Sequence, residues 1–99
     1  MNKKHLAKIT WFSEDEGGRK IIPPEGVRYC PIIGTVQENN IWSIDFICPD
    51  FSKTNIIEFS FLSADAPEGL IALNERYCLF EGTKKVAEIY VIGDRQNEI

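Results

Sequence analysis

Residues 41–62, IWSIDFICPDFSKTNIIEFSFL, decide the fold class of this chain. Two runs within this stretch alternate between apolar and polar residues, which is the pattern of β-strands with one face in a core. We predict strands over 41–47 and 56–62, separated by Pro49-Asp50 and a polar loop. Their core faces carry Trp42, Ile44, Phe46 and Cys48 in the first strand and Ile57, Phe59 and Phe61 in the second.

The same alternation extends toward the N-terminus. It predicts strands over 6–12 and 27–33, with Ala7, Ile9 and Trp11 on one face of the first. Pro31 lies inside the second strand and predicts either an edge position or a bulge, because proline lacks the amide hydrogen of a strand ladder. The polar residues at 37–40, QENN, predict a turn.

On the C-terminal side, strands are predicted over 76–80 and 84–92. The turn Glu81-Gly82-Thr83 joins them as a hairpin in which glycine supplies a positive φ. The last strand is apolar on nearly both faces, which favours a place in the middle of a sheet. Residues 63–74 are the least strand-like. They predict a turn at Pro67-Glu68-Gly69 and a short helical turn at either 64–66 or 70–73.

Six strands in 99 residues, with turn signals between them and no amphipathic helix, predict an all-β fold. We expect a closed six-stranded antiparallel Greek-key barrel, because closure removes the exposed edges of an open sheet. The length fits one domain over 1–99, with frayed termini at 1–4 and 94–99.

The composition indicates which partners and which cellular compartment to expect. Eleven Lys and Arg against fifteen Asp and Glu leave a net charge of −4, which argues against general nucleic-acid binding and suits a basic protein partner. Cys30, Cys48 and Cys78 include no C-x-x-C spacing and predict buried free thiols in a reducing compartment. The sequence shows neither a signal-peptide apolar region nor a run of 18 apolar residues, so we expect a cytoplasmic protein that does not enter a membrane.

Chemistry-bearing residues are sparse. His5, the single histidine, lies near the N-terminus and is expected in solvent, and the adjacent carboxylates of 14–16 fit a solvated loop. The run Gly17-Gly18-Arg19-Lys20 is followed by no helix, so it predicts no nucleotide cradle, although Arg19 could contact a phosphate with its side chain. We therefore predict no catalytic residue, no metal and no cofactor.

Two stretches resemble a known family. FSEDEGGRK at 12–20, followed by GVRYCPIIGT at 26–35, is similar to the start of the C-terminal β-barrel of translation elongation factor Tu and its eukaryotic and archaeal counterpart. RYCLFEGTKKVAEIYVI at 76–92 resembles the closing hairpin of that barrel. The segment 37–74 matches in strand count and in a Pro-Asp turn, so the resemblance covers about half of the chain.

The resemblance implies a six-stranded barrel without catalytic activity that packs on a neighbouring barrel, holds the T-stem backbone of aminoacyl-tRNA and meets the exchange factor. Arg19 matches the family arginine that touches tRNA, and Glu81-Gly82 matches the second tRNA contact. Cys30 departs from the family, which has a tRNA-contacting glutamine there, and Thr83 replaces a glycine. The GTPase domain of the family has no counterpart in this sequence.

Three hypotheses follow from these observations. The first is a non-enzymatic protein-binding module built on this barrel. The alternative is an RNA-binding protein that contacts a tRNA-like backbone, and the third is a small enzyme. For binding, the resemblance and the basic residues of the two loops point to Arg19, Lys20, Arg28, Glu81, Gly82 and Lys84.

Overall fold

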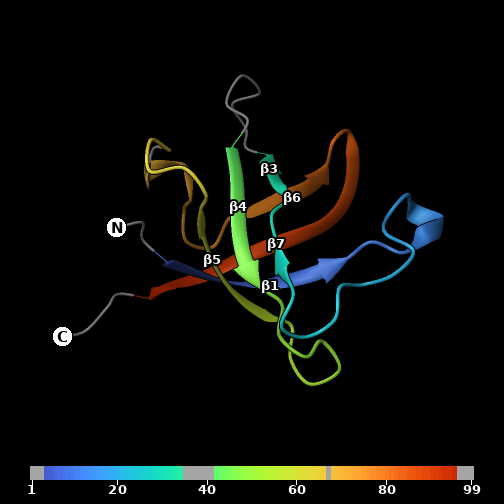
Figure 1. The fold of residues 1–99 in the computed structure, drawn as a ribbon. Coiled ribbons are helices and arrows are strands. Elements are labelled where there is room, and N and C mark those ends of the chain that lie inside the picture. The colour runs from blue at the N-terminus through green and yellow to red at the C-terminus, as the bar shows by residue number, and fades with distance from the viewer. Residues whose placement is uncertain (1–3, 35–41, 67, 96–99) are drawn as a thin grey trace.

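A computed structural model describes residues 4–34, 42–66 and 68–95 of the chain. The fold is all-β, as predicted (Figure 1). Two single 3-10 turns, η1 (Glu14–Glu16) and η2 (Glu68–Leu70), lie between strands. The strands are β1 (Lys4–Trp11), β2 (Arg28–Tyr29), β3 (Ile32–Gly34), β4 (Trp42–Ile47), β5 (Ile56–Phe61), β6 (Arg76–Glu81) and β7 (Lys84–Arg95).

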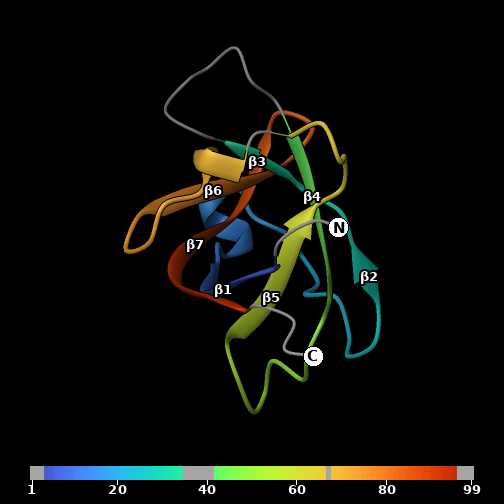
Figure 2. The ribbon, with the colours of Figure 1, turned by 90° about the vertical axis from the view of Figure 1, so that its left-hand side faces the viewer.

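Six of the strands close into an antiparallel barrel, which confirms the predicted architecture. Around the barrel the order is β3, β6, β7, β1, β5 and β4, and β4 pairs back with β3. The consecutive strands β3, β4 and β5 lie side by side and β5 returns beside β1, which is a Greek-key connection. The short strand β2 lies beside β4, on the side away from β5 (Figure 2).

Pro31 divides the strand predicted over 27–33 into β2 and β3. Arg28 lies opposite Ile47 and Ile32 lies opposite Ser43, so the register against β4 is unchanged across the break. The backbone amide of Ile44 donates to the carbonyl oxygen of Pro31 at 3.0 Å, but proline has no amide hydrogen to return. The prediction of a bulge was therefore wrong. The prediction of an edge position holds for β2 but not for β3, which pairs with both β4 and β6.

Two extra residues distort β7, which lies between β6 and β1 as its apolar faces predicted. Against β6, the register shifts by one so that Val86 has no opposite residue. Against β1, Ile92 is the extra residue. Val86 and Ala87 are both buried, because the first shift turns two consecutive side chains inward.

The barrel interior is filled by the strand faces that the alternation indicated. Trp42 is partly buried and packs against this core. Cys48 is buried as predicted, but the prediction of a buried thiol was wrong for Cys30, which is exposed because it lies on the outward side of the break at Pro31. The largest fully buried apolar side chains are Phe59, Phe61, Ile33, Ile44, Ile57, Leu79, Ile89, Val86, Val91 and Cys48.

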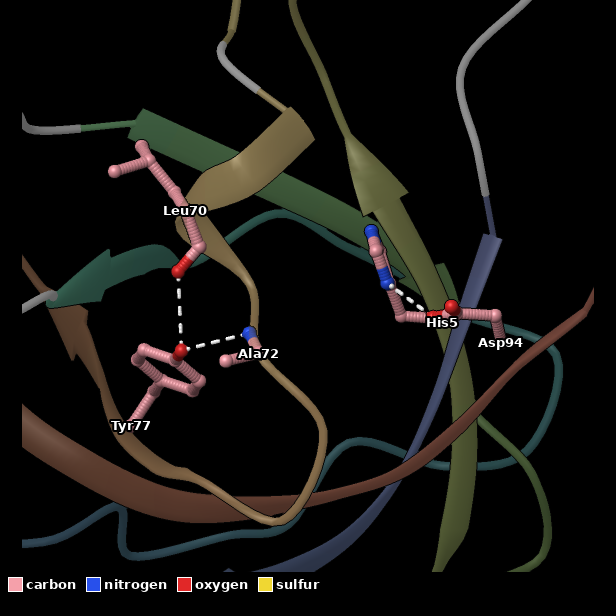
Figure 3. A network of polar contacts seen from close by, with 5 residues as sticks. All are labelled: His5, Leu70, Ala72, Tyr77 and Asp94. Atoms are coloured by element: carbon pink, nitrogen blue, oxygen red, sulfur yellow. Dashed lines mark hydrogen bonds and ion pairs between the residues drawn. The ribbon is translucent and has the colours of Figure 1, made fainter.

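His5 corrects two predictions about the chain ends. It lies in β1 and is 1% exposed rather than solvated, because its side chain points to the barrel interior like Ala7 and Ile9. Its Nδ1 lies 2.9 Å from Oδ1 of Asp94 on β7 (Figure 3). The extra residue Ile92 makes this contact possible, because it brings Asp94 opposite His5. Lys4 and Asp94 thus belong to paired strands and are not frayed, while 1–3 and 96–99 lie outside the described residues.

A second set of polar contacts fixes the segment before β6 (Figure 3). The hydroxyl of Tyr77 donates to the carbonyl oxygen of Leu70 at 3.0 Å and accepts from the amide of Ala72 at 2.9 Å. The helical turn of this segment is η2, at 68–70, rather than at 64–66 or 70–73. The predicted turn at 37–40 and residues Ile41 and Pro67 lie outside the described residues.

Candidate binding site

The connection from β1 to β2 is held in a defined shape by its own hydrogen bonds. Glu16 accepts from the backbone amide of Ser13 at 2.9 Å and from its hydroxyl at 3.1 Å, which closes the turn η1. Gly17 follows at φ +87°. Gly18 is buried so closely against Phe12 that a Cβ would lie 2.0 Å from the Phe12 carbonyl oxygen. The two glycines therefore let the chain turn back toward the barrel at Arg19.

Arg19 is brought to the turn between β6 and β7, on the right in Figure 1. Its Nη1 donates to Oε2 of Glu81, and the hydroxyl of Tyr29 donates to the same oxygen. Its Nε donates to the carbonyl oxygen of Ile21 at 2.8 Å, and its guanidinium carbon lies 5.5 Å from the centre of the Tyr29 ring. We call Arg19, Tyr29 and Glu81 the Arg19 cluster.

Aromatic packing holds this cluster at the end of the barrel. The ring of Tyr29 lies 5.6 Å from the rings of both Trp11 and Phe46, and Trp11 contacts Phe51 edge-on at 5.5 Å. These side chains come from β1, β2, β4 and the loop after β4. Because Trp11 and Phe46 pack against the Tyr29 ring and Phe51 supports Trp11, the Tyr29 hydroxyl and the guanidinium stacked on the ring hold Glu81 in one orientation.

The electrostatics of the cluster favour its charged form. Burial raises the pKa of the Glu81 carboxyl, but the hydrogen bonds from Tyr29 and Arg19 and the charges of Arg19 and Lys84 outweigh this, so the pKa is lower than usual. Burial and the neighbouring Glu81 raise the pKa of the Tyr29 hydroxyl. The hydrogen bond to Glu81 raises the pKa of Arg19. Arg19 and Glu81 are therefore an ion pair at neutral pH.

The structure brings together some of the predicted binding residues and separates others. Glu81 and Lys84 lie opposite each other in the hairpin, and Gly82 makes the turn at φ +63°. Lys20 is exposed beside Arg19. Arg28 does not join them, because it lies on the outer face of the barrel, where its Nη2 is 2.8 Å and its Nε 3.0 Å from Oδ2 of Asp45.

Tyr29 is the member of the cluster that the sequence analysis missed. Its position was implied by the alternation of the strand, because Tyr29 shares the inward face with Pro31 and Ile33. What the alternation cannot indicate is that the loop over 12–27 folds back so that Arg19 covers this tyrosine, since that depends on Gly18 packing against Phe12.

The surface around the cluster mixes charge with apolar side chains. Glu14, Asp15 and Glu16 are exposed on η1. Ile21 is 69% exposed and Ile22 is 45% exposed, immediately after Arg19 and Lys20. We call the surface formed by the loop 12–27 and the turn 81–84 the Arg19 rim.

Among the described residues, no group of three or more His, Cys, Asp and Glu side chains could hold a metal ion. The same part of the chain has no helix long and apolar enough to cross a membrane. His5 lies opposite Asp94, close to the N-terminal end of β1, whereas the Arg19 cluster lies beyond the C-terminal end of that strand. Comparison with models of known protein families and with curated proteins finds no match.

Proposed function

We propose that this barrel is a protein-binding module and that the Arg19 rim is its contact surface. The observation that carries the proposal is the ion pair between Arg19 and Glu81 beside exposed isoleucines. A phosphate-binding surface needs N–H donors that are available to the phosphate, whereas the Arg19 guanidinium donates from Nη1 to Glu81 and from Nε to the Ile21 carbonyl oxygen, and so has fewer donors left. Exposed apolar side chains that lie among charges of both signs are instead typical of surfaces that bind other proteins.

The chemistry of the rim indicates the chemistry of its partner. Exposed Ile21 and Ile22 offer an apolar contact, and the three carboxylates of η1 lie in the same loop. A partner that places an apolar side chain against the isoleucines and Lys or Arg against η1 would complement both features. The net charge of −4 supports the same choice of a basic partner.

We further propose that the module is related to the C-terminal barrel of the elongation factor Tu family. The matched stretches 12–20 and 76–92 support this, because they supply Arg19 and Glu81 from opposite ends of the sequence. In that family the barrel works by holding other macromolecules and not by catalysis. The proposed role here is likewise non-enzymatic.

The test compares capture of proteins by the immobilised wild-type chain with capture by two variants. Ile21→Asp places a charge in the rim. Leu73→Asp is the matched control, because Leu73 is 59% exposed and precedes β6, at the end of that strand opposite to Glu81. We expect the wild type and Leu73→Asp to retain the same partner and Ile21→Asp to lose it.

A parallel titration with tRNA at two salt concentrations tests the alternative partner class. Tight tRNA binding that weakens as salt rises, with no captured protein, would replace this proposal with RNA binding. Equal capture of the same proteins by the wild type and both variants would show that the rim is not the contact surface.

A further inference from the structure

A second surface with its own chemistry lies on the outer face of the barrel. A groove of about 310 Å³ there is lined by Lys8, Thr10, Asn55, Arg76, Glu88 and Tyr90. None of these residues belongs to the Arg19 rim. The lining comes from β1, β6 and β7 and from the end of the loop before β5.

Strand register places an aromatic ring between two cations in this groove. Tyr90 on β7 lies opposite Lys8 on one side and opposite Arg76 on the other. Neighbouring strands are about 4.8 Å apart, so the Lys8 and Arg76 backbones are separated by about 10 Å across Tyr90. Both long side chains can therefore reach one group bound between them.

Two of these three residues, Tyr90 and Arg76, are held in place by contacts within the protein. The Arg76 guanidinium carbon lies 5.0 Å from the centre of the Tyr90 ring, and Nη1 of Arg76 is 3.2 Å from Oε1 of Glu88. The Tyr90 hydroxyl donates to Oδ1 of Asn74 at 3.2 Å. Asn74 has a φ of +66°, a conformation that few residues other than glycine adopt. The ring and the guanidinium are thus oriented before any ligand arrives.

The charge of the groove favours an anion. Glu88 offsets the charge of Arg76, but Lys8 is exposed and makes no ion pair with any residue that the structure describes. A guanidinium with one bond to a carboxylate keeps further N–H donors for a ligand. Thr10 and Asn55 add neutral polar groups to the same lining. The chain as a whole is acidic, with a net charge of −4, so a groove that gathers hydrogen-bond donors and cations differs from the rest of the protein.

We propose that this groove binds a small molecule through a dianionic phosphate group, held between the Lys8 ammonium and the Arg76 guanidinium. Lys8 and Arg76, with Glu88 offsetting one of their charges, leave the groove a net charge of +1, and several donors match the three oxygens of a phosphate monoester. A groove of this size also falls at the lower end of the range for small-molecule sites. The proposal is independent of the protein-binding role of the rim.

The test is a titration of the full chain with inorganic phosphate and, separately, with glycerol 3-phosphate, followed by the backbone amide shifts of the protein. We expect saturable shifts at Lys8, Thr10 and Tyr90. Lys8→Gln should weaken the affinity about tenfold, the effect of losing one charge-assisted hydrogen bond. Lys85→Gln is the matched control, because it removes the same charge from β7, the strand that pairs with the strand of Lys8, at about 17 Å along β7 from Tyr90.

The titrations distinguish an organic phosphate ligand, an inorganic phosphate ligand and a general charge effect. Tighter binding of glycerol 3-phosphate would support an organic phosphate as the ligand, and equal binding would support inorganic phosphate. Thermal unfolding of each variant shows whether it keeps the fold. Shifts that do not saturate, or an equal loss of affinity in Lys8→Gln and Lys85→Gln, would overturn the proposal, because a general charge effect explains both results.

Discussion

The carboxyl group of Glu81 makes the stability of the barrel depend on pH. Its pKa is lower in the folded protein than its ordinary value of 4.5, because the bonds from Tyr29 and Arg19 outweigh the effect of burial. Its ionised form therefore stabilises the fold above about pH 4.5, and that contribution is lost as the pH falls through the folded-state pKa.

We expect Glu81→Gln to lower the free energy of unfolding by about 1 kcal/mol at pH 7, a modest value because solvent screens this partly exposed pair. At pH 3 the wild type and the variant should differ much less. Urea denaturation at both pH values measures the effect. A difference of the same size at pH 3 and pH 7 would mean that Glu81 acts by packing and not by its charge.

At the scale of single elements, the contact between His5 and Asp94 joins the first and last strands. Removing it in Asp94→Ala should cost about 1 kcal/mol, the usual contribution of one hydrogen bond. The loss should be local, because β1 and β7 remain paired from Ala7 to Trp11. Hydrogen exchange should thus become faster at Leu6 while the amide of Ile89 keeps its protection. Uniformly faster exchange along β7 would contradict this local role.

The strands also show what a sequence can and cannot predict. Period-two alternation located β4, β5 and the hairpin of β6 and β7, because each of these strands has one face in the core. It could not reveal the extra residues Val86 and Ile92, since a bulge is defined by the opposite strand. His5 was misjudged because the predicted strand began at residue 6, whereas β1 begins at Lys4 and the same alternation places His5 on the inward face with Ala7 and Ile9.

The candidate site also contains residues that the sequence predicted correctly and residues that it did not. Arg19 and Glu81 were predicted from the sequence and lie in contact. Arg28 was grouped with them because the resemblance matched it to a basic position near the contacts, yet strand alternation turns it to the outer face and Tyr29 to the inner one. Which residues share a rim is thus determined by the direction of each side chain and by loop packing at Gly18.

At the scale of the whole molecule, two junctions of the barrel have short ladders among the described residues, β3 with β4 and β4 with β5. β4 and β5 pair at Ile44 with Phe61 and at Asp45 with Ser60, extended by one bond from the Leu62 amide to the Ser43 carbonyl oxygen. By contrast, β1 and β7 pair along eight residues of β1. Few backbone bonds therefore hold the barrel closed between β4 and β5.

We expect this junction to open before the barrel unfolds. Native-state hydrogen exchange in increasing urea should show the Leu62 amide exchanging with a lower free energy than the amides of β7. Ile44→Val, which keeps the strand and removes one methyl group, should lower the exchange free energy of Leu62. Exchange of Leu62 only through global unfolding would show that side-chain packing at Phe61 compensates for the short ladder.

The two extra residues of β7 also limit how the length of this strand can change. Between Val86 and Ile92 the strand keeps Glu88 and Tyr90 on the outer surface and Ile89 and Val91 in the interior. Deleting one residue inside this interval would turn the groove side chains into the core and expose the apolar ones. Deletion of Ile92 itself would restore an unbroken ladder with β1. Single-residue length changes in β7 are thus tolerable at its two irregular positions and disruptive between them.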